Sequence, residues 1–215
     1  MIVVVDYGMG NLRSVSKALE ALGASVRVSS DPKDVAGADK IILPGVGAFP
    51  AAMRELTTRK LIEPITSAIA SGKPYLGICL GLQLLFEESD EGQGAKGLGV
   101  LAGRVKRFAF PAPRAPRPAP LKIPHMGWNQ IRPQTTDHRP QNQCPLLKGI
   151  PEGSFFYFVH SYYAEPADRT VTAAETDYGG RFASMVWRDN LFATQFHPEK
   201  SQAVGLQLLK DFVSL

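Results

Sequence analysis

Short apolar runs and amphipathic segments alternate along the first part of the chain. Apolar runs at residues 2–6, 25–28, 40–43 and 73–78 predict buried β-strands. Apolar residues recur at helical spacing over 11–22 and 80–88, and 50–71 is predicted to be mostly helical with a break or kink at Pro64. This alternation predicts an α/β fold with a mostly parallel, doubly wound central sheet flanked by helices.

The second part of the chain is richer in extended segments. Strands are predicted at 104–108, 154–159, 170–175, 182–187 and 191–196, and a helix at 201–213. Asp189 and Asn190 form a turn signal that joins the last two strands into a hairpin. We therefore expect an additional antiparallel, strand-rich part within a single domain spanning residues 1–215.

The composition is that of an ordinary globular protein, with 44% hydrophobic and 20% charged residues in 215. The start of the chain has no basic segment and predicts a strand, not a signal peptide. No apolar run approaches the roughly 20 residues that span a membrane, so no membrane association is expected. Two cysteines give no disulfide framework, which favours a cytoplasmic location.

Positive charge is concentrated in the middle of the chain. Residues 92–136 contain eight Lys or Arg and no Asp or Glu, whereas the net charge of the whole chain is +4. Prolines dilute these charges over 110–121, which predicts a stiff, extended excursion. That segment holds no aromatic side chain on which a base could stack, apart from Phe110 at its start, so no nucleic acid partner is expected.

Candidate chemistry begins at Cys79. The sequence Gly77-Ile78-Cys79-Leu80-Gly81-Leu82-Gln83 has the layout of a nucleophile elbow, a sharp turn between a strand and a helix, with cysteine in place of serine. An isolated cysteine is more often a small buried hydrophobe. The flanking glycines and the strand–helix context favour a nucleophile, and the N-terminus of the following helix is expected to favour its thiolate.

A base for this nucleophile is available 118 residues later, in His197-Pro198-Glu199. The imidazole of His197 can remove or return a proton, and a carboxylate two residues away can orient it. Acyl transfer also needs N–H donors for the oxyanion. Leu80, directly after the nucleophile, and the loop of Gly45, Val46 and Gly47 are the candidates, although such a loop can equally be a plain turn.

Other motifs predict neither a cofactor nor a metal. Gly8-Met9-Gly10 follows a strand as in a dinucleotide fingerprint, but Arg13 occupies the third glycine position, so a nicotinamide site is rejected. His125, His138 and His160 lack paired metal-ligand spacing, and Cys144 is expected to be structural.

At this point the residues resemble a known family. The elbow together with His197-Pro198-Glu199 is similar to the class I (triad) glutamine amidotransferases. Within that class, four segments resemble the glutaminase subunits of imidazole glycerol phosphate synthases: Asp6–Leu12 (DYGMGNL), 44–49 (PGVGAF), 124–129 (PHMGWN) and 157–162 (YFVHSY). The resemblance runs from Met1 to the last predicted helix and implies the class I glutaminase fold.

The resemblance implies that glutamine is hydrolysed through a γ-glutamyl thioester on Cys79, with His197 as general base and then acid and Glu199 orienting it. The ammonia would pass to a partner cyclase, a (β/α)₈ barrel, in a heterodimer. There it would yield imidazole glycerol phosphate and aminoimidazole carboxamide ribonucleotide, a step of histidine biosynthesis.

Further roles are carried over by position. The resemblance places Gly47, Gln83, Ser161 and Tyr162 at the bound glutamine and Val46 in an oxyanion strand whose peptide reorients when the cyclase is occupied. It places Asn11, Trp128, Tyr157 and Lys200 near the cyclase. The proline-rich segment 110–121 is longer than the family pattern and holds no catalytic position.

Two alternatives stay open beside this interpretation. One is a free-standing cysteine hydrolase on the same scaffold, such as a γ-glutamyl hydrolase or an intracellular peptidase, which would be active without a partner. The other is a binding subunit without catalysis. The presence of Cys79, His197 and Glu199 together argues against the second, because binding requires none of them.

Overall fold

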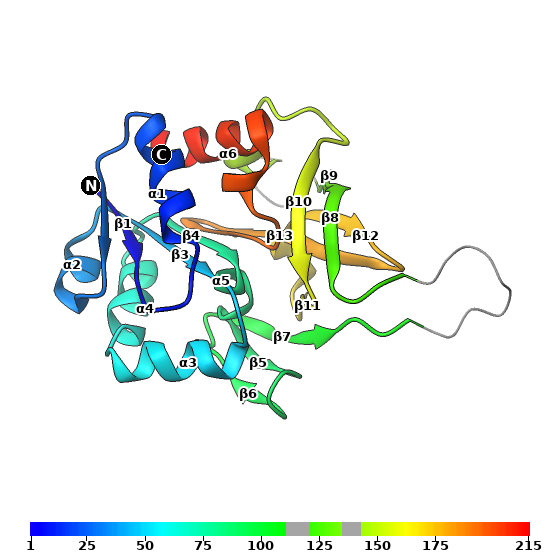
Figure 1. Ribbon diagram of the computed structural model, residues 1–215, viewed down its shortest axis with the longest axis horizontal. Helices are drawn as coiled ribbons and strands as arrows, with labels where there is room; N and C mark the ends of the chain where they lie inside the picture. Colours follow the sequence, from blue (N-terminus) through cyan, green and yellow to red (C-terminus); the bar gives the residue numbers. More distant parts are fainter. Residues whose placement is uncertain (111–120, 135–142) are drawn as a thin grey trace, which may run out of the picture.

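Five parallel strands form the centre of the structure, a computed structural model that describes residues 1–110, 121–134 and 143–215 (Figure 1). They are β2 (Val26–Ser29), β1 (Ile2–Val5), β3 (Lys40–Gly45), β4 (Tyr75–Cys79) and β14 (Leu191–Thr194), in that spatial order. Gly45 at the end of β3 pairs with Cys79 at the end of β4. The carboxyl ends of these two strands therefore meet at one point, where parallel sheets bind ligands.

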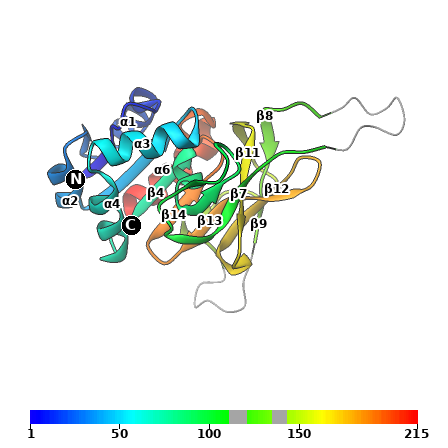
Figure 2. The same cartoon turned by 90° about the horizontal axis from the view of Figure 1, so that it is seen from below.

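The sheet continues beyond β14 through a mostly antiparallel part. In order, the strands are β13 (Arg181–Arg188), β11 (Tyr162–Pro166), β7 (Leu101–Arg107), β5 (Phe86–Ser89) and β6 (Ala95–Lys96). Strand β12 (Thr172–Asp177) also pairs with β13, and β9 (Arg132–Pro133) pairs with β12. A separate two-stranded antiparallel sheet pairs β8 (His125–Gln130) with β10 (Phe155–His160). Figure 2 shows β8, β9, β11 and β12 at the end of the molecule away from helices α1, α2 and α4.

Helices cover both faces of the parallel strands, because nearly every residue in these strands is apolar. Val3 and Val5 of β1 face a core shared with α2 (Pro32–Gly37), α3 (Phe49–Thr58) and α4 (Ile62–Ala70). Ile2 and Val4 face the opposite core, with α1 (Leu12–Ala21) and α6 (Gln202–Ser214). The structure thus confirms the predicted fold, a mostly parallel sheet between helices with an antiparallel extension.

The short helical turns complete the element list: α5 (Leu80–Gln83), η1 (Pro145–Leu147), η2 (Arg169–Val171) and η3 (Pro198–Lys200). The helix predicted over 80–88 is wrong, since α5 ends after one turn and β5 follows. The carbonyls of Leu84 and Leu85 accept hydrogen bonds from the backbone of Leu98 and Val100. These hydrogen bonds to residues 98–100 replace the hydrogen bonds that a continuing helix would make. A pattern of apolar residues alone cannot predict this replacement.

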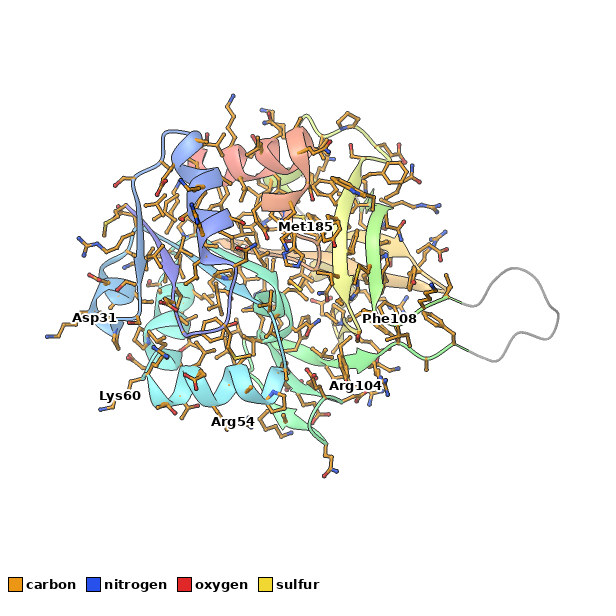
Figure 3. The ribbon with its side chains drawn as sticks, in the orientation of Figure 1. Asp31, Arg54, Lys60, Arg104, Phe108 and Met185 are labelled. Carbon is orange, nitrogen blue, oxygen red and sulfur yellow. The ribbon has the colours of Figure 1, made fainter. Side chains whose placement is uncertain are left out.

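The break predicted at Pro64 is also misplaced. The chain leaves α3 and enters α4 through residues 59–61, where Lys60 adopts a φ of 58° (Figure 3). Pro64 is the third residue of α4. A proline in the first turn of a helix removes no intrahelical hydrogen bond, since the first N–H groups have no partner within the helix.

The Pro/Arg-rich stretch at 111–120 and His138 lie outside the described residues. The residues that flank 111–120 pack in an aromatic cluster around Phe108, which lies beside the start of β8 (Figure 3). Phe110 packs on Phe108 and Tyr178, and the Tyr178 hydroxyl donates to the Lys122 carbonyl at 2.8 Å. Within the described ranges, no helix has the length and apolar character required to cross a bilayer.

Candidate active site

Cys79 occupies a strained turn between β4 and α5. Its backbone has φ 55° and ψ −105°, a region that non-glycine residues rarely adopt. The turn depends on its glycines, because a Cβ on Gly81 would lie 1.9 Å from the carbonyl oxygen of Leu43, and one on Gly77 would lie 2.6 Å from the carbonyl of Gly81. The geometry is that of the predicted elbow. With α5 only one turn long, however, the expected support of the thiolate by a helix dipole is weak.

His197 and Glu199 form a buried pair beside this turn. The Nδ1 of His197 lies 2.9 Å from Oε1 of Glu199, and the side chains are 2% and 1% exposed. Backbone contacts hold the segment in place: the His197 N–H donates to the Tyr157 carbonyl, and the Ser201 hydroxyl donates to the His197 carbonyl. Nδ1 is therefore protonated toward the carboxylate, which leaves Nε2 to take a proton.

Electrostatics favour a positive charge on His197. Burial lowers its pKa, but negative charge on Cys79 and a hydrogen bond and negative charge from Glu199 outweigh burial and raise the pKa well above the ordinary value of 6.5. Nε2 has no hydrogen-bond partner at ordinary distance among the described residues. The raised pKa of His197 thus reflects its attraction to the negative charge of a Cys79 thiolate.

A cavity of about 330 Å³ opens above the nucleophile. Cys79 lines it together with six residues that the sequence had suggested for the oxyanion hole or for glutamine: Val46, Gly47, Leu80, Gln83, Ser161 and Tyr162. Sequence reasoning missed Glu91, Pro124, Val159 and His160 in the same wall. Glu91 stands in a polar turn and is positioned by the N–H of Phe49, which donates to its carboxylate at 2.8 Å; no motif marks it.

The loop after β3 contributes Val46 and Gly47 to the cavity wall. Val46 is 40% exposed, although apolar, and Gly47 has a φ of 100°. Gly45 is closely enclosed, because a Cβ there would meet the Tyr7 hydroxyl at 2.4 Å and the Leu80 Cβ at 2.8 Å. The backbone of the loop thus lies against the elbow, close to where an oxyanion on the cavity side of Cys79 would form.

Two buried histidines, His160 and His125, form a hydrogen-bonded chain behind Tyr162, which lines the cavity. His160 Nδ1 donates to the Tyr162 carbonyl at 2.8 Å, and because a carbonyl only accepts, His160 Nε2 must accept from His125 Nδ1 at 2.9 Å. His125 Nε2 then accepts from Asn129 at 3.2 Å. Burial lowers the pKa of His125 to about 4 and that of His160 to about 3, so both rings are neutral near pH 7.

The side-chain amides of Gln83 and Gln195 connect the Tyr162 carbonyl to the sulfur of Cys79. Gln83 Nε2 donates to the Tyr162 carbonyl at 2.9 Å and to Gln195 Oε1 at 3.0 Å. Gln195 Nε2 in turn lies 3.7 Å from Cys79 Sγ. Gln83 is buried, not exposed as a surface helix residue would be. Gln195 was missed in the sequence; its position two residues before His197 was the one available signal.

The residues predicted at a partner interface are partly brought together. The rings of Trp128 and Tyr157 lie 6.1 Å apart, and Lys200 Nζ lies 5.8 Å from the centre of the Tyr157 ring. Trp128 is 47% exposed, and the Tyr157 ring is 6.5 Å from that of His197. Asn11 directly precedes α1, and α1 packs against η3, the turn that contains Lys200.

The arrangement fits nucleophilic attack on a small carbonyl compound. A thiol and a glycine-rich loop line one cavity, and a buried base with its own carboxylate acts on the thiol, as acyl transfer requires. Across the described residues, His, Cys, Asp and Glu side chains do not gather in groups of three or more that could hold a metal ion.

Comparison with known proteins gives a consistent picture. The family model "Glutamine amidotransferase class-I" matches residues 3–214. The chain is 55% identical over 212 residues to the imidazole glycerol phosphate synthase subunit HisH of Syntrophotalea carbinolica, covering 99% of this chain and 98% of that protein. It is 53% identical over 215 residues to the HisH subunit of Synechococcus elongatus, covering 99% and 92%.

Solved structures share the fold at low sequence identity. One, described as a glutamine amidotransferase, superposes with a TM-score of 0.73 at 18% identity and covers 100% of both chains. PurLQS from Thermotoga maritima gives a TM-score of 0.69 at 19% identity, covering 99% of this chain and 97% of that chain. At these identities the likeness concerns the fold alone.

Proposed function

Because the chain belongs to the HisH subunits of imidazole glycerol phosphate synthases, within the class-I glutamine amidotransferases, we propose that Cys79, His197 and Glu199 carry its glutaminase reaction. The chain is a glutamine amidotransferase and acts in histidine biosynthesis. It is the glutaminase subunit of a two-component synthase. In that synthase it hydrolyses glutamine, and the ammonia is transferred onward.

The reaction follows from the order of groups around the sulfur. The Cys79 thiolate attacks the γ-carbonyl carbon of glutamine, and the carbonyl oxygen becomes an oxyanion that N–H groups of Leu80 and of the Val46–Gly47 loop stabilise. The His197 imidazolium gives its proton to the amide nitrogen, the C–N bond breaks, and ammonia leaves. His197 then removes a proton from water, whose oxygen attacks the thioester, and glutamate and the Cys79 thiolate are released beside the imidazolium. Glu199 keeps Nδ1 protonated throughout.

Glutamine is held by Gly47, Gln83, Ser161 and Tyr162 in this proposal, all of which line the cavity of Cys79. Both Nε2 hydrogens of Gln83 are already donated to protein oxygens, so a substrate N–H can bond only to its Oε1. The carboxylate of Glu91 lies in the same wall and suits the α-ammonium group of an amino acid.

The partner cyclase is proposed to bind over Trp128, Tyr157, Lys200 and Asn11. Support comes from the exposed apolar side chains on β8 and β10, where Met126 is 62% and Phe155 is 52% exposed beside Trp128. Exposed aromatic and methionine side chains grouped in this way are typical of protein interfaces. The same strands reach His197 through the Tyr157 ring, so a partner seated there would lie next to the chemistry.

Finer features belong to the same proposal. The partner is a (β/α)₈ barrel, the two chains form a heterodimer, and residues 1–215 make one amidotransferase domain, as the match over 3–214 supports. The enzyme works in the cytoplasm, where a thiol nucleophile stays reduced. Reorientation of the Val46 peptide is proposed to couple an occupied cyclase to glutamine hydrolysis.

The observation that carries the mechanism is that Cys79 shares one cavity with the Val46–Gly47 loop, while the buried His197–Glu199 pair acts on the same sulfur from within the protein. The test measures glutamate formed from glutamine by this chain alone, with the cyclase, and with the cyclase plus its nucleotide ligand. We expect negligible activity alone, a steep rise with the liganded partner, and none in Cys79→Ala. Full activity alone, indifferent to the partner, would contradict the Val46 coupling and favour a free-standing hydrolase.

A further inference from the structure

The amide of Gln195 is oriented by its neighbours. Tyr162 offers a backbone carbonyl, which can only accept, so the end of Gln83 facing it must be the NH₂ group. The same NH₂ group donates to the end of Gln195 nearest to it, which must therefore be the oxygen. The NH₂ group of Gln195 is left to face Cys79 Sγ, 3.7 Å away.

The environment of the sulfur makes this contact consequential. Gln195 is fully buried, so its N–H groups have no competing water. Beside His197, whose charge acts on the sulfur, Sγ has a polar contact with the Val159 carbonyl at 3.9 Å, to which a thiol can donate. On ionisation that carbonyl becomes repulsive toward the sulfur, whereas the N–H of Gln195 becomes a charge-assisted donor. The two contacts therefore select opposite protonation states.

We propose that Gln195 is the hydrogen-bond donor that stabilises the Cys79 thiolate, and that Gln83 is the positioning residue that fixes its orientation. This inference rests on the proposed function, in which Cys79 is the nucleophile. The Gln195 amide is an uncharged donor to the sulfur, and its position does not depend on the protonation state of His197. The donor acts twice in the reaction, on the attacking thiolate and on the thiolate that leaves the thioester.

Several other groups face the sulfur and must be kept constant in a test. His197 approaches from the segment before η3, and Tyr7 from the end of β1, where burial raises the pKa of its hydroxyl above the ordinary value. His160 and Glu91 line the same cavity. Substitution at Gln195 leaves all four in place.

The experiment is alkylation of Cys79 by iodoacetamide in the full-length chain as a function of pH. Modification is quantified by mass spectrometry of the Cys79 peptide, so that Cys144 does not contribute. Gln195→Met retains length and volume without a donor, and Gln195→Glu retains shape but places an acceptor at the sulfur. Ser184→Ala is the control, because Ser184 is buried on the neighbouring strand β13 and its carbonyl accepts the Gln195 backbone N–H.

Loss of a hydrogen bond to a charged group should move the pH midpoint of alkylation upward by about one unit in Gln195→Met. A less stabilised thiolate is also more nucleophilic, with a Brønsted coefficient of about 0.4–0.5. The profiles should therefore cross: roughly threefold slower than wild type on the acid side and roughly threefold faster on the alkaline side. Gln195→Glu should move the midpoint further, Gln83→Leu less, and Ser184→Ala not at all.

A residue with only a structural role would lower the alkylation rate by one factor at every pH. That result, or an unchanged midpoint in folded Gln195→Met or Gln195→Glu, overturns the proposal. If Gln195→Met fails to fold by circular dichroism, the isosteric Gln195→Glu decides. Alkylation needs neither glutamine nor the cyclase, so absence of glutaminase activity in the wild-type chain with the liganded cyclase would refute the proposed function separately. With the liganded cyclase, Gln195→Met should lower kcat about tenfold at neutral pH and leave KM unchanged.

Discussion

At the scale of single residues, the proposed mechanism gives the Glu199 carboxylate one function, which is to hold His197 Nδ1 protonated and the ring in place. Replacing it with the isosteric amide in Glu199→Gln removes the charge and frees the tautomer. Because general acid–base catalysis contributes about 10²–10⁴-fold, we expect kcat for glutamine to fall by at least about 10²-fold. KM should change little, since Glu199 does not line the cavity. Steady-state glutaminase assays with the liganded cyclase measure both values.

The matched control for this substitution is Asp211→Asn. Asp211 also has a buried carboxylate oxygen without a partner in the described structure, but it lies on α6 and bonds to Gln207. Its replacement should leave kcat near the wild-type value. Equal losses in the two variants would mean that carboxylate burial supports folding and not the orientation of His197.

His160 supplies a pH dependence of stability with a definite sign. Burial holds its pKa at about 3 in the folded chain, below the value of about 6.5 expected when unfolded. The unfolded chain therefore binds the proton first, and stability falls as pH drops below about 6.5 toward the folded value. Between pH 7 and pH 5 the wild type should lose roughly 2 kcal/mol from this residue.

Urea unfolding of wild type and His160→Gln at both pH values isolates that contribution, since carboxylates titrate alike in the two proteins. Glutamine can still donate to the Tyr162 carbonyl and accept from His125, but it has no proton to gain. From pH 7 to pH 5, the free energy of unfolding of the wild type should fall by roughly 2 kcal/mol more than that of His160→Gln. Parallel pH profiles would show that the ring is protonated or solvated in the folded state.

At the scale of elements, the elbow requires close contacts between the backbones of α5 and β3. A Cβ on Gly81 would lie 1.9 Å from the Leu43 carbonyl, a backbone atom of β3 that cannot move aside without shifting the strand. Gly81→Ala should therefore destabilise the protein by about 3 kcal/mol, the upper part of the range for overpacking. The free energy of unfolding in urea measures this loss.

Gly37→Ala is the control for Gly81→Ala. Gly37 ends α2, and no heavy atom of the described structure outside its immediate neighbours lies within 4 Å of a Cβ placed there. Alanine in a helix is favoured over glycine by about 0.5–1 kcal/mol, so this variant should be as stable as wild type or slightly more. Comparable destabilisation of both variants would mean that the close approach of α5 to β3 is not what requires glycine at position 81.

The elements show what a single sequence can and cannot predict. The parallel strands were located within two residues, because each is a short apolar run between turn signals. The one-turn helix α5 was overextended, because Leu82, Leu85 and Phe86 are buried whether they lie in a helix or a strand. The short helix α2 was missed, although Asp31 caps it through the Lys33 N–H and Pro32 begins it, because six residues are too few to show a period.

The active site shows the same limits at the scale of the whole molecule. Cys79 and His197 lie far apart in sequence and meet because β4 and β14 are adjacent parallel strands that end at the same edge. The motifs predicted both residues and their pairing. Glu91 and Gln195 could not be found in this way, since their roles arise only from the packing of several elements around one cavity.

The exposed apolar face of β8 and β10 is a feature of the assembled molecule, not of either strand alone. If the partner binds there, Trp128 is its natural anchor, being large, half exposed and braced by the Tyr157 ring. Trp128→Ala should weaken binding of the cyclase by about 30-fold or more, the equivalent of about 2 kcal/mol for a central interface residue. Titration calorimetry with the purified cyclase measures the change in Kd.

Val28→Ala provides the comparison for this surface, because Val28 is 43% exposed on β2, an edge strand of the large sheet, whereas β8 and β10 form a separate sheet. Removing apolar area there should leave Kd unchanged if binding is specific to β8 and β10. Alkylation of Cys79 in Trp128→Ala should match wild type, since the Trp128 ring does not line the cavity. Equal weakening by both substitutions would point to nonspecific adhesion, and an unchanged Kd in Trp128→Ala would place the cyclase on another face.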